Sequence, residues 1–168
     1  MTIGTHATAL VLTVSDGVTA GTRSDESGER IAERLAGEGF AVERGTVPDD
    51  AAAIASAVRE GVTGHRLLIT TGGTGLTSRD VPPQAIEPLL DYLVPGLAEL
   101  MRAHGLRSTP NAALSRSLAG VIGRTLIIAV PGSPKGAIES LEAVLPVLPH
   151  ALETLADDSS RHVTSSPR

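Results

Sequence analysis

The hydrophobic positions of the chain fall into short runs that are separated by polar, glycine-containing segments. Four of these runs are rich in aliphatic and β-branched residues and stop abruptly at a loop, which is typical of strands. They cover residues 7–14, 40–47, 66–71 and 124–130. The run 40–47 alternates only partly and ends at Pro48, so we expect that strand to be less buried than the others.

Between these runs the apolar residues recur at helical spacing. The segment that begins at Asp25 places Ile31 and Leu35 on one face, and Gly37 or Gly39 can end that helix. Further helices are predicted over residues 51–62, 82–93, 94–105 and 135–156. Strands that alternate with helices indicate βαβ units, so the sequence predicts an α/β fold in which a parallel sheet is covered on both faces.

The domain organisation follows from length and from the absence of a linker. A chain of 168 residues fits one compact domain, and neither an internal repeat nor a flexible segment divides it. We expect this domain to cover residues 1–156. The segment 157–168 is polar and lacks apolar anchors, so it is predicted to be a disordered tail.

Composition excludes several classes of function. A formal net charge of −5 without a basic run argues against nucleic-acid binding. The chain has no cysteine, which excludes disulfides and thiolate metal sites and fits the reducing cytoplasm. No apolar run approaches the roughly 20 residues that span a bilayer, so we expect no membrane association.

The segment ITTGGTGLTSRD, residues 69–80, carries the clearest chemical signal. It is neither a Walker A motif nor G-x-G-x-x-G. Its glycines allow close approach of the backbone to a ligand, and its N–H groups and hydroxyls suit phosphate or another polar anion. The alternative is a tight connection from strand to helix, in which Gly72, Gly73 and Gly75 serve only to adopt positive φ angles.

Two aspartates stand before predicted helices and can be explained as N-caps. They are Asp49, which follows Pro48, and Asp80, which precedes Pro82. The carboxyl ends of parallel strands gather ligands, so the loops at Ser15-Asp16, Asp49, the glycine segment and Pro131 are predicted to converge on one crevice. Two carboxylates in such a crevice can hold Mg²⁺ for a nucleotide.

Taken together, these motifs are similar to those of the MogA/MoaB family of molybdenum cofactor biosynthesis. The resemblance covers residues 7–156 and includes, besides the glycine segment with Arg79-Asp80, the motifs Ser15-Asp16, Asp25-x-Ser27-Gly28, Val47-Pro48-Asp49, Leu114-Ser115-Arg116 and Pro131-Gly132-Ser133-Pro134. It implies a three-layer αβα sandwich with a mostly parallel sheet, usually a homotrimer, that binds molybdopterin. In catalytic members AMP passes from Mg-ATP to the terminal phosphate of molybdopterin, and pyrophosphate is released.

The resemblance also implies roles for single residues. Asp49 and Asp80 match the two functional aspartates of the family and are the expected catalytic residues and Mg²⁺ ligands, while Ser115 matches its pterin-site serine. The expected substrate-binding residues are Ser15, Asp16, Thr70, Thr71, Gly72, Gly73, Thr74, Gly75, Ser115, Arg116, Pro131, Gly132 and Ser133. A molybdenum insertase of the MoeA type is the partner that the resemblance suggests.

Some positions depart from the family pattern. The family commonly reads Arg-Asp-Val-Thr-Pro-Glu-Ala, whereas this chain has Pro82 and Gln84 at the threonine and glutamate positions, and Gly17 where many relatives have arginine. These changes leave a second hypothesis open, a non-catalytic MoaB-type protein that binds molybdopterin or serves in assembly. A Rossmann-type nucleotide module requires a glycine fingerprint that the chain lacks.

Overall fold

The computed structural model describes residues 7–157, and their six strands form a single sheet. The strand order is β2-β1-β3-β6-β5-β4. The strands are β1 (Thr8–Val14), β2 (Ala41–Val47), β3 (Leu67–Thr71), β4 (Tyr92–Leu93), β5 (Leu118–Ile122) and β6 (Thr125–Val130). Strands β1, β2, β3 and β6 run parallel, whereas β5 and β4 are antiparallel to their neighbours. All four strands predicted from the sequence are confirmed, and β2 is the exposed edge strand.

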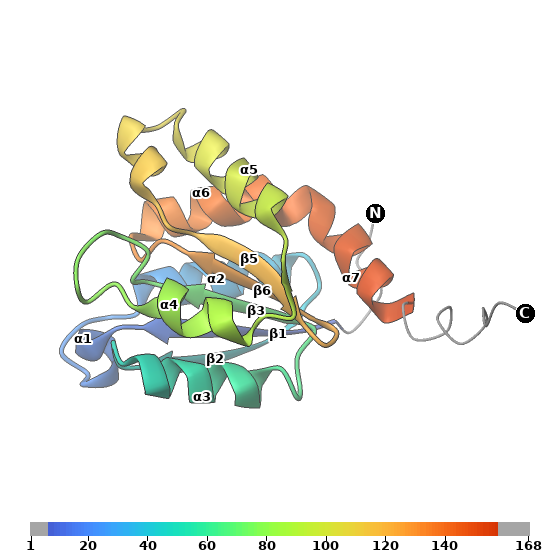
Figure 1. The fold of residues 1–168 in the computed structure, drawn as a ribbon, viewed down its shortest axis with the longest axis horizontal. Helices are drawn as coiled ribbons and strands as arrows, with labels where there is room; N and C mark the ends of the chain where they lie inside the picture. Colours follow the sequence, from blue (N-terminus) through green and yellow to red (C-terminus); the bar gives the residue numbers. More distant parts are fainter. Residues whose placement is uncertain (1–6, 158–168) are drawn as a thin grey trace, which may run out of the picture.

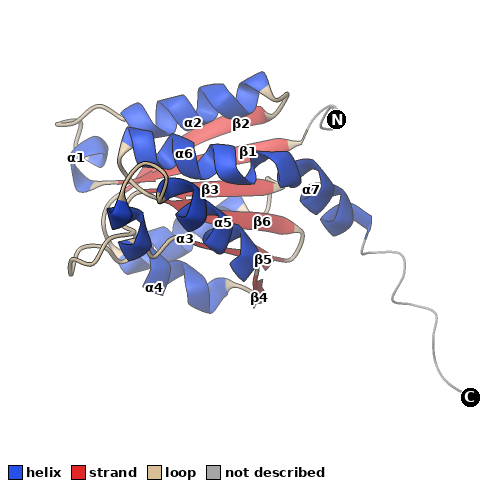
Figure 2. Ribbon diagram, turned by 90° about the horizontal axis from the view of Figure 1, so that it is seen from above, coloured by secondary structure: helices blue, strands red, loops and turns tan. Residues whose placement is uncertain are grey.

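Helices cover both faces of this sheet and give the predicted three layers (Figure 1). One face carries α2 (Glu26–Gly37), α5 (Pro95–Gly105), α6 (Pro134–Val144) and α7 (Leu148–Asp157), and the other carries α3 (Ala51–Gly61) and α4 (Pro82–Ile86). Figure 2 shows the first group in front of the sheet. The short helix α1 (Asp16–Thr19) follows β1 directly. None of the described helices is long and apolar enough to cross a membrane.

The predicted helix over 82–93 is wrong in its second half. Helix α4 ends at Ile86, a 3₁₀ turn follows over Glu87–Leu89, and β4 pairs with β5. Pro88 explains the break, because it lacks the N–H that continues a helix. Strand β5 was not predicted, because Gly120 interrupts its short apolar run. That glycine is needed there, since a Cβ at position 120 would lie 2.7 Å from the carbonyl oxygen of Tyr92.

The predicted helix over 135–156 is two helices. A 3₁₀ turn, Leu145–Val147, separates α6 from α7, and Pro146 and Pro149 remove two backbone donors at that point. Helix α7 ends at Asp157. The rest of the predicted tail, 158–168, lies outside the described residues.

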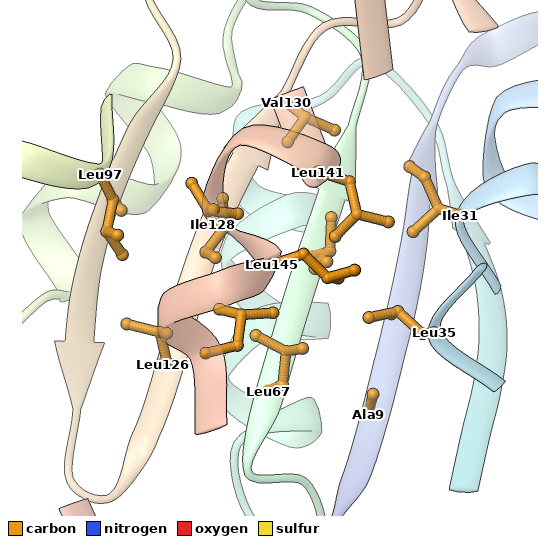
Figure 3. Close-up of a cluster of buried hydrophobic side chains, with 14 of the residues drawn as sticks. Ala9, Ile31, Leu35, Leu67, Leu97, Leu126, Ile128, Val130, Leu141 and Leu145 are labelled. Carbon is orange, nitrogen blue, oxygen red and sulfur yellow. The ribbon is translucent and has the colours of Figure 1, made fainter. Parts of the chain in front are cut away.

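The core is aliphatic and lies on both faces of the central strands. Figure 3 shows Ile31 of α2 and Leu141 of α6 among the buried side chains of one cluster that also includes Leu67 and Ile128 of the sheet. A second cluster joins Ile54 and other residues of α3 and α4 to the opposite face. Strands β3 and β6 are therefore buried along their whole length. Burial on both faces fixes their register, and with it the position of the loops at their carboxyl ends.

Candidate functional site

A cavity of about 880 Å³ lies at the carboxyl ends of the parallel strands. Each of these four strands contributes residues to its lining: Thr13–Ser15 at the end of β1, Asp49 after β2, Thr71–Gly75 after β3, and Pro131–Ser133 after β6. The chain runs from β1 to β2 on one side and returns to β3 on the other, which is the switch point where such folds bind ligands. The predicted convergence of the four loops is confirmed.

The glycine loop has a conformation that only glycine adopts easily. Gly72 has φ 115° and Gly73 has φ 65°. A Cβ at position 72 would lie 2.4 Å from the carbonyl oxygen of Val14, so the loop packs directly against the end of β1. Gly75 has no positive φ, but a Cβ there would lie 2.9 Å from a carboxylate oxygen of Asp80. The glycines thus bring the backbone of this loop close to both β1 and Asp80.

Asp80 is not the N-cap that the sequence suggested. The N-cap position of α4 is Val81, without a side-chain hydrogen bond. The Asp80 carboxylate instead turns back into its own loop and accepts hydrogen bonds from the N–H and the hydroxyl of Thr77, both at 2.8 Å. Burial alone raises the pKa of Asp80, but the bonds from Thr77 and Gly75 and the charge of Arg116 outweigh burial and lower it. Asp80 is therefore an ionised side chain on the cavity wall.

Asp49 does not cap a helix either. The next residue, Asp50, caps α3 by accepting a 2.8 Å hydrogen bond from the N–H of Ala53. Asp49 and Asp16 instead bind each other reciprocally, because each carboxylate accepts from the other residue's backbone N–H, at 3.0 and 2.9 Å. This exchange joins the loops that follow β1 and β2 and holds the Asp49 carboxylate in the cavity wall.

Two arginines of the sequence motifs, Arg79 and Arg116, bind residues of the loops around the cavity. Arg79 forms an ion pair with Asp16 and approaches Asp49 at 3.7 Å. Arg116 donates to the carbonyl oxygens of Gly75 at 2.7 Å and Asp80 at 2.5 Å. Neither arginine is among the residues that line the cavity. Both instead tie the segment 75–80 to its neighbours.

Other predicted residues divide into two groups. Ser15, Thr71, Gly72, Gly73, Thr74, Gly75, Ser115, Pro131, Gly132 and Ser133 all line the cavity. Thr70 is not among the lining residues. It lies inside β3, its side chain is buried, and its hydroxyl has no hydrogen-bond partner among the described residues. The expected contact between Thr70 and a substrate stays a prediction that this geometry does not favour. Asp16 is bonded to Asp49 but lies outside the lining.

Asp25 belongs to the Asp25-x-Ser27-Gly28 motif, but the motif alone does not indicate its role. Asp25 caps α2 and accepts hydrogen bonds from Gly28 N–H at 3.0 Å and the Thr13 hydroxyl at 2.8 Å. Its other oxygen pairs with Arg44 at 2.8 Å. A Cβ at Gly28 would lie 2.3 Å from the Thr13 hydroxyl, which explains the glycine of this motif. Asp25 thus holds the start of α2 against β1 at the cavity wall.

Arg102 was missed altogether, because it sits in α5 in no recognisable motif. It lines the cavity, and its Nη1 donates to the carbonyl oxygens of Ser115 at 3.3 Å and Ser117 at 2.9 Å. The hydroxyls of these two serines lie 2.8 Å apart. Only the tertiary structure brings α5 to this loop.

The charges on the cavity wall are unbalanced. Five carboxylates and two arginines line it: Asp25, Glu26, Asp49, Asp80 and Glu139, with Arg23 and Arg102. The described residues contain no group of three or more acids and histidines placed to hold a metal ion. Bound Mg²⁺ commonly uses only one or two protein carboxylates, with substrate phosphates and waters as its other ligands. Asp49 and Asp80 fit that pattern of hard oxygen donors.

The sequence matches a known protein family over most of its length. Residues 10–150 match the family described as "Probable molybdopterin binding domain". The chain belongs to this family. The resemblance to MogA and MoaB inferred from the motifs is thereby confirmed.

Relatives of known structure and curated relatives agree with this assignment. The molybdopterin biosynthesis enzyme MoaB from Thermus thermophilus is 54% identical, with a TM-score of 0.82 over 89% of this chain and 96% of that one. Gephyrin from Dictyostelium discoideum is 40% identical over 84% of this chain. The molybdopterin adenylyltransferase of Haemophilus influenzae is 35% identical over 80% of this chain and 71% of its own length.

Many of these relatives are longer proteins. The chain spans 21% of that gephyrin and about half of several other curated relatives. What such a relative does as a whole protein is therefore not established for this chain by similarity alone.

Proposed function

We propose that this protein is a molybdopterin adenylyltransferase, which transfers AMP from Mg-ATP to the terminal phosphate of molybdopterin and releases pyrophosphate. One observation gives this proposal its main support. Asp49 and Asp80 do not cap helices, and both line the same cavity as the glycine loop and Ser115. Relatives that carry the name molybdopterin adenylyltransferase include a protein 35% identical over 80% of this chain and one 45% identical over 53% of it.

The reaction is a substitution at phosphorus. A phosphate oxygen of molybdopterin attacks the α-phosphorus of ATP, and the bond from that phosphorus to the departing diphosphate breaks. Pyrophosphate leaves with the electron pair, so no redox partner is needed. Such a displacement depends mainly on in-line positioning and on neutralising oxygens, rather than on a covalent protein intermediate.

The charge of the cavity explains why a cation belongs to this proposal. Two polyanionic substrates meet a wall on which carboxylates outnumber arginines. Asp49 and Asp80 would hold Mg²⁺, which when bound neutralises phosphate oxygens. The chain's own part is to fix both carboxylates in place. Thr77 does so for Asp80, and the backbone N–H of Asp16 does so for Asp49.

The residues that depart from the family pattern, Gly17, Pro82 and Gln84, are not among those that line this cavity. Pro82 is buried at the start of α4 and packs behind the cavity residue Gly73, where an added Cβ would lie 2.5 Å from Pro82 Cδ. Gln84 lines a separate, smaller hollow beside β5. Asp49 and Asp80, the two carboxylates that the proposal requires, remain on the cavity wall, and this supports the enzyme over the non-catalytic alternative.

The proposal is tested by pyrophosphate release from Mg-ATP, measured with and without molybdopterin. We expect release only when molybdopterin is present, and a loss of at least about 100-fold in Asp80→Asn. The asparagine keeps an acceptor for Thr77, so the unfolding free energy should change by no more than about 2 kcal/mol. Molybdopterin binding without any release of pyrophosphate would instead favour the binding or assembly protein.

Assembly and location form part of the same proposal. We place the protein in the cytoplasm as a homotrimer that passes its product to an insertase of the MoeA type. Exposed apolar side chains on β4 and α5, among them Tyr92, Leu93 and Leu100, suit a subunit interface. The molar mass of the purified protein, measured by light scattering, tests the trimer. A monomeric mass at all protein concentrations in the micromolar range would contradict it.

A further inference from the structure

Arg102 carries a positive charge that no carboxylate of the described residues neutralises. Its contacts are the carbonyl oxygens of Ser115 and Ser117, and both are made through Nη1. The remaining guanidinium nitrogens, Nε and Nη2, form no hydrogen bond with a described residue. The side chain is half-buried in the wall of the main cavity. A half-buried, unpaired arginine is unusual, because burial without a counter-charge costs free energy.

Other arginines near the site differ from Arg102. Arg79 pairs with Asp16, and Arg44 pairs with Asp25. Arg116 binds carbonyl oxygens but lies outside the cavity lining. Arg23, the other arginine of the lining, sits in an exposed loop after α1 and forms no described side-chain bond. Among the arginines within residues 7–157, Arg102 alone combines a fixed position, an uncompensated charge and access to the cavity.

The anchoring of Arg102 determines what it can bind. Two carbonyl oxygens hold one end of the planar guanidinium and leave the other donors free. Because the side chain is already held, little further conformational entropy is lost when those donors bind a ligand. A guanidinium edge matches two oxygens of a phosphate group, and such charge-assisted bonds are strong. A neutral polar group satisfies the donors but leaves the charge unbalanced.

We propose that Arg102 binds a phosphate oxyanion of a substrate in the main cavity. This inference rests on the proposed function, which supplies two sources of that chemistry, the phosphate monoester of molybdopterin and the triphosphate of ATP. Arg102 is a binding residue, and it offsets the excess of carboxylates on the same wall. The serine loop 115–117 serves as its anchor.

The test separates the charge of Arg102 from its anchoring role. Arg102→Gln keeps an amide donor for the carbonyl oxygens of Ser115 and Ser117 but removes the charge, whereas Arg102→Lys keeps the charge. Arg107→Gln is the matched control, because Arg107 is exposed just beyond the same helix and lies outside the cavity lining. Thermal unfolding of all three variants shows whether the fold is retained.

Steady-state kinetics then identify the source of the phosphate. We expect Arg102→Gln to raise the KM of one substrate by about 10- to 100-fold, the range for a charge-assisted contact, while kcat changes less than about threefold. Arg102→Lys should recover part of this loss, and Arg107→Gln should match the wild type. A selective rise for molybdopterin assigns Arg102 to the monoester, and a selective rise for ATP assigns it to the triphosphate. If Arg102→Gln behaves like Arg107→Gln, the side chain only anchors the loop and the inference fails.

A binding measurement keeps this inference distinguishable from the proposed reaction. Calorimetric titration with inorganic phosphate, as the probe of the monoester, and with pyrophosphate, as the probe of the triphosphate, requires no turnover. We expect the affinity for one of the two anions to fall at least about 10-fold in Arg102→Gln. If the wild type binds one of them through Arg102 but never releases pyrophosphate from Mg-ATP, the inference stands and the proposed function falls. Equal affinity of the wild type and Arg102→Gln for both anions, or no affinity for either at millimolar concentration, overturns the inference.

Discussion

Gly72→Ala probes the contact between the glycine loop and the end of β1. Gly72 has φ 115°, a region that an L-residue enters at a cost of about 1 to 3 kcal/mol. In addition, the new Cβ would lie 2.4 Å from the carbonyl oxygen of Val14. Because that oxygen belongs to the backbone of a strand paired on both sides, it cannot rotate away, and the overlap adds about 1 to 2 kcal/mol. We expect a loss of about 2 to 5 kcal/mol in the free energy of unfolding.

Urea denaturation measures this loss. With a slope of about 2 kcal/mol per molar, the midpoint should fall by about 1 to 2.5 M. Gly37→Ala is the control, since position 37 ends α2, has no positive φ and has no atom within 4 Å of the added Cβ. Alanine should leave stability unchanged there, or raise it by up to about 1 kcal/mol. A midpoint for Gly72→Ala within about 0.3 M of the wild type would refute the strained, closely packed loop.

Three further predictions concern the aspartates and Ser115. Asp50→Ala removes the cap of α3, so it should lower the free energy of unfolding by about 1 kcal/mol but leave AMP transfer intact. Asp49→Asn should abolish AMP transfer with little effect on the free energy of unfolding. The reverse pattern in the transfer and unfolding assays would contradict the roles assigned to these two aspartates. Thr77→Val removes a donor to the Asp80 carboxylate, so the pKa of Asp80 should rise, as titration by carbon-13 NMR can show. Since the folded protein lowers this pKa, the ionised carboxylate stabilises the fold above about pH 4. The difference in unfolding free energy between Thr77→Val and the wild type should therefore vanish as the pH falls through the lowered pKa of Asp80. A difference that persists at low pH would contradict this explanation. Ser115→Ala should weaken binding of molybdopterin more than binding of ATP in calorimetry, and equal weakening would remove Ser115 from the pterin pocket.

Local patterns in the sequence were enough to predict most of the strands and helices. The runs that became β1, β3 and β6 are continuous and aliphatic because both of their faces are buried, and that signal is independent of distant residues. The rule that ligands gather at carboxyl ends of parallel strands then placed the glycine loop beside Asp49 and Pro131. Helix boundaries were less certain where prolines interrupt an apolar pattern, as at Pro88 and Pro146.

The candidate site was predictable only in part. The motifs pointed to Asp49 and Asp80 as catalytic residues, but each could equally be explained as a cap, because a preferred capping residue before a helix is a strong local signal. Asp50 takes that role for α3, and Thr77 binds Asp80 within its own loop. Thr70 belongs to the same motif, yet its side chain is buried, because helices cover both faces of β3.

By itself, the sequence determined the strand and helix order, the motifs of the glycine loop and the aliphatic core. These features depend on residues that are close along the chain, so their spacing is visible in the amino-acid order. Tertiary structure decided which groups meet: Asp16 binds Asp49 across 33 positions, and Arg102 reaches the carbonyl oxygen of Ser117 from another element. Such contacts depend on how the sheet and helices pack. The charge balance of the cavity is therefore a property of the fold, although every residue that sets it is present in the sequence.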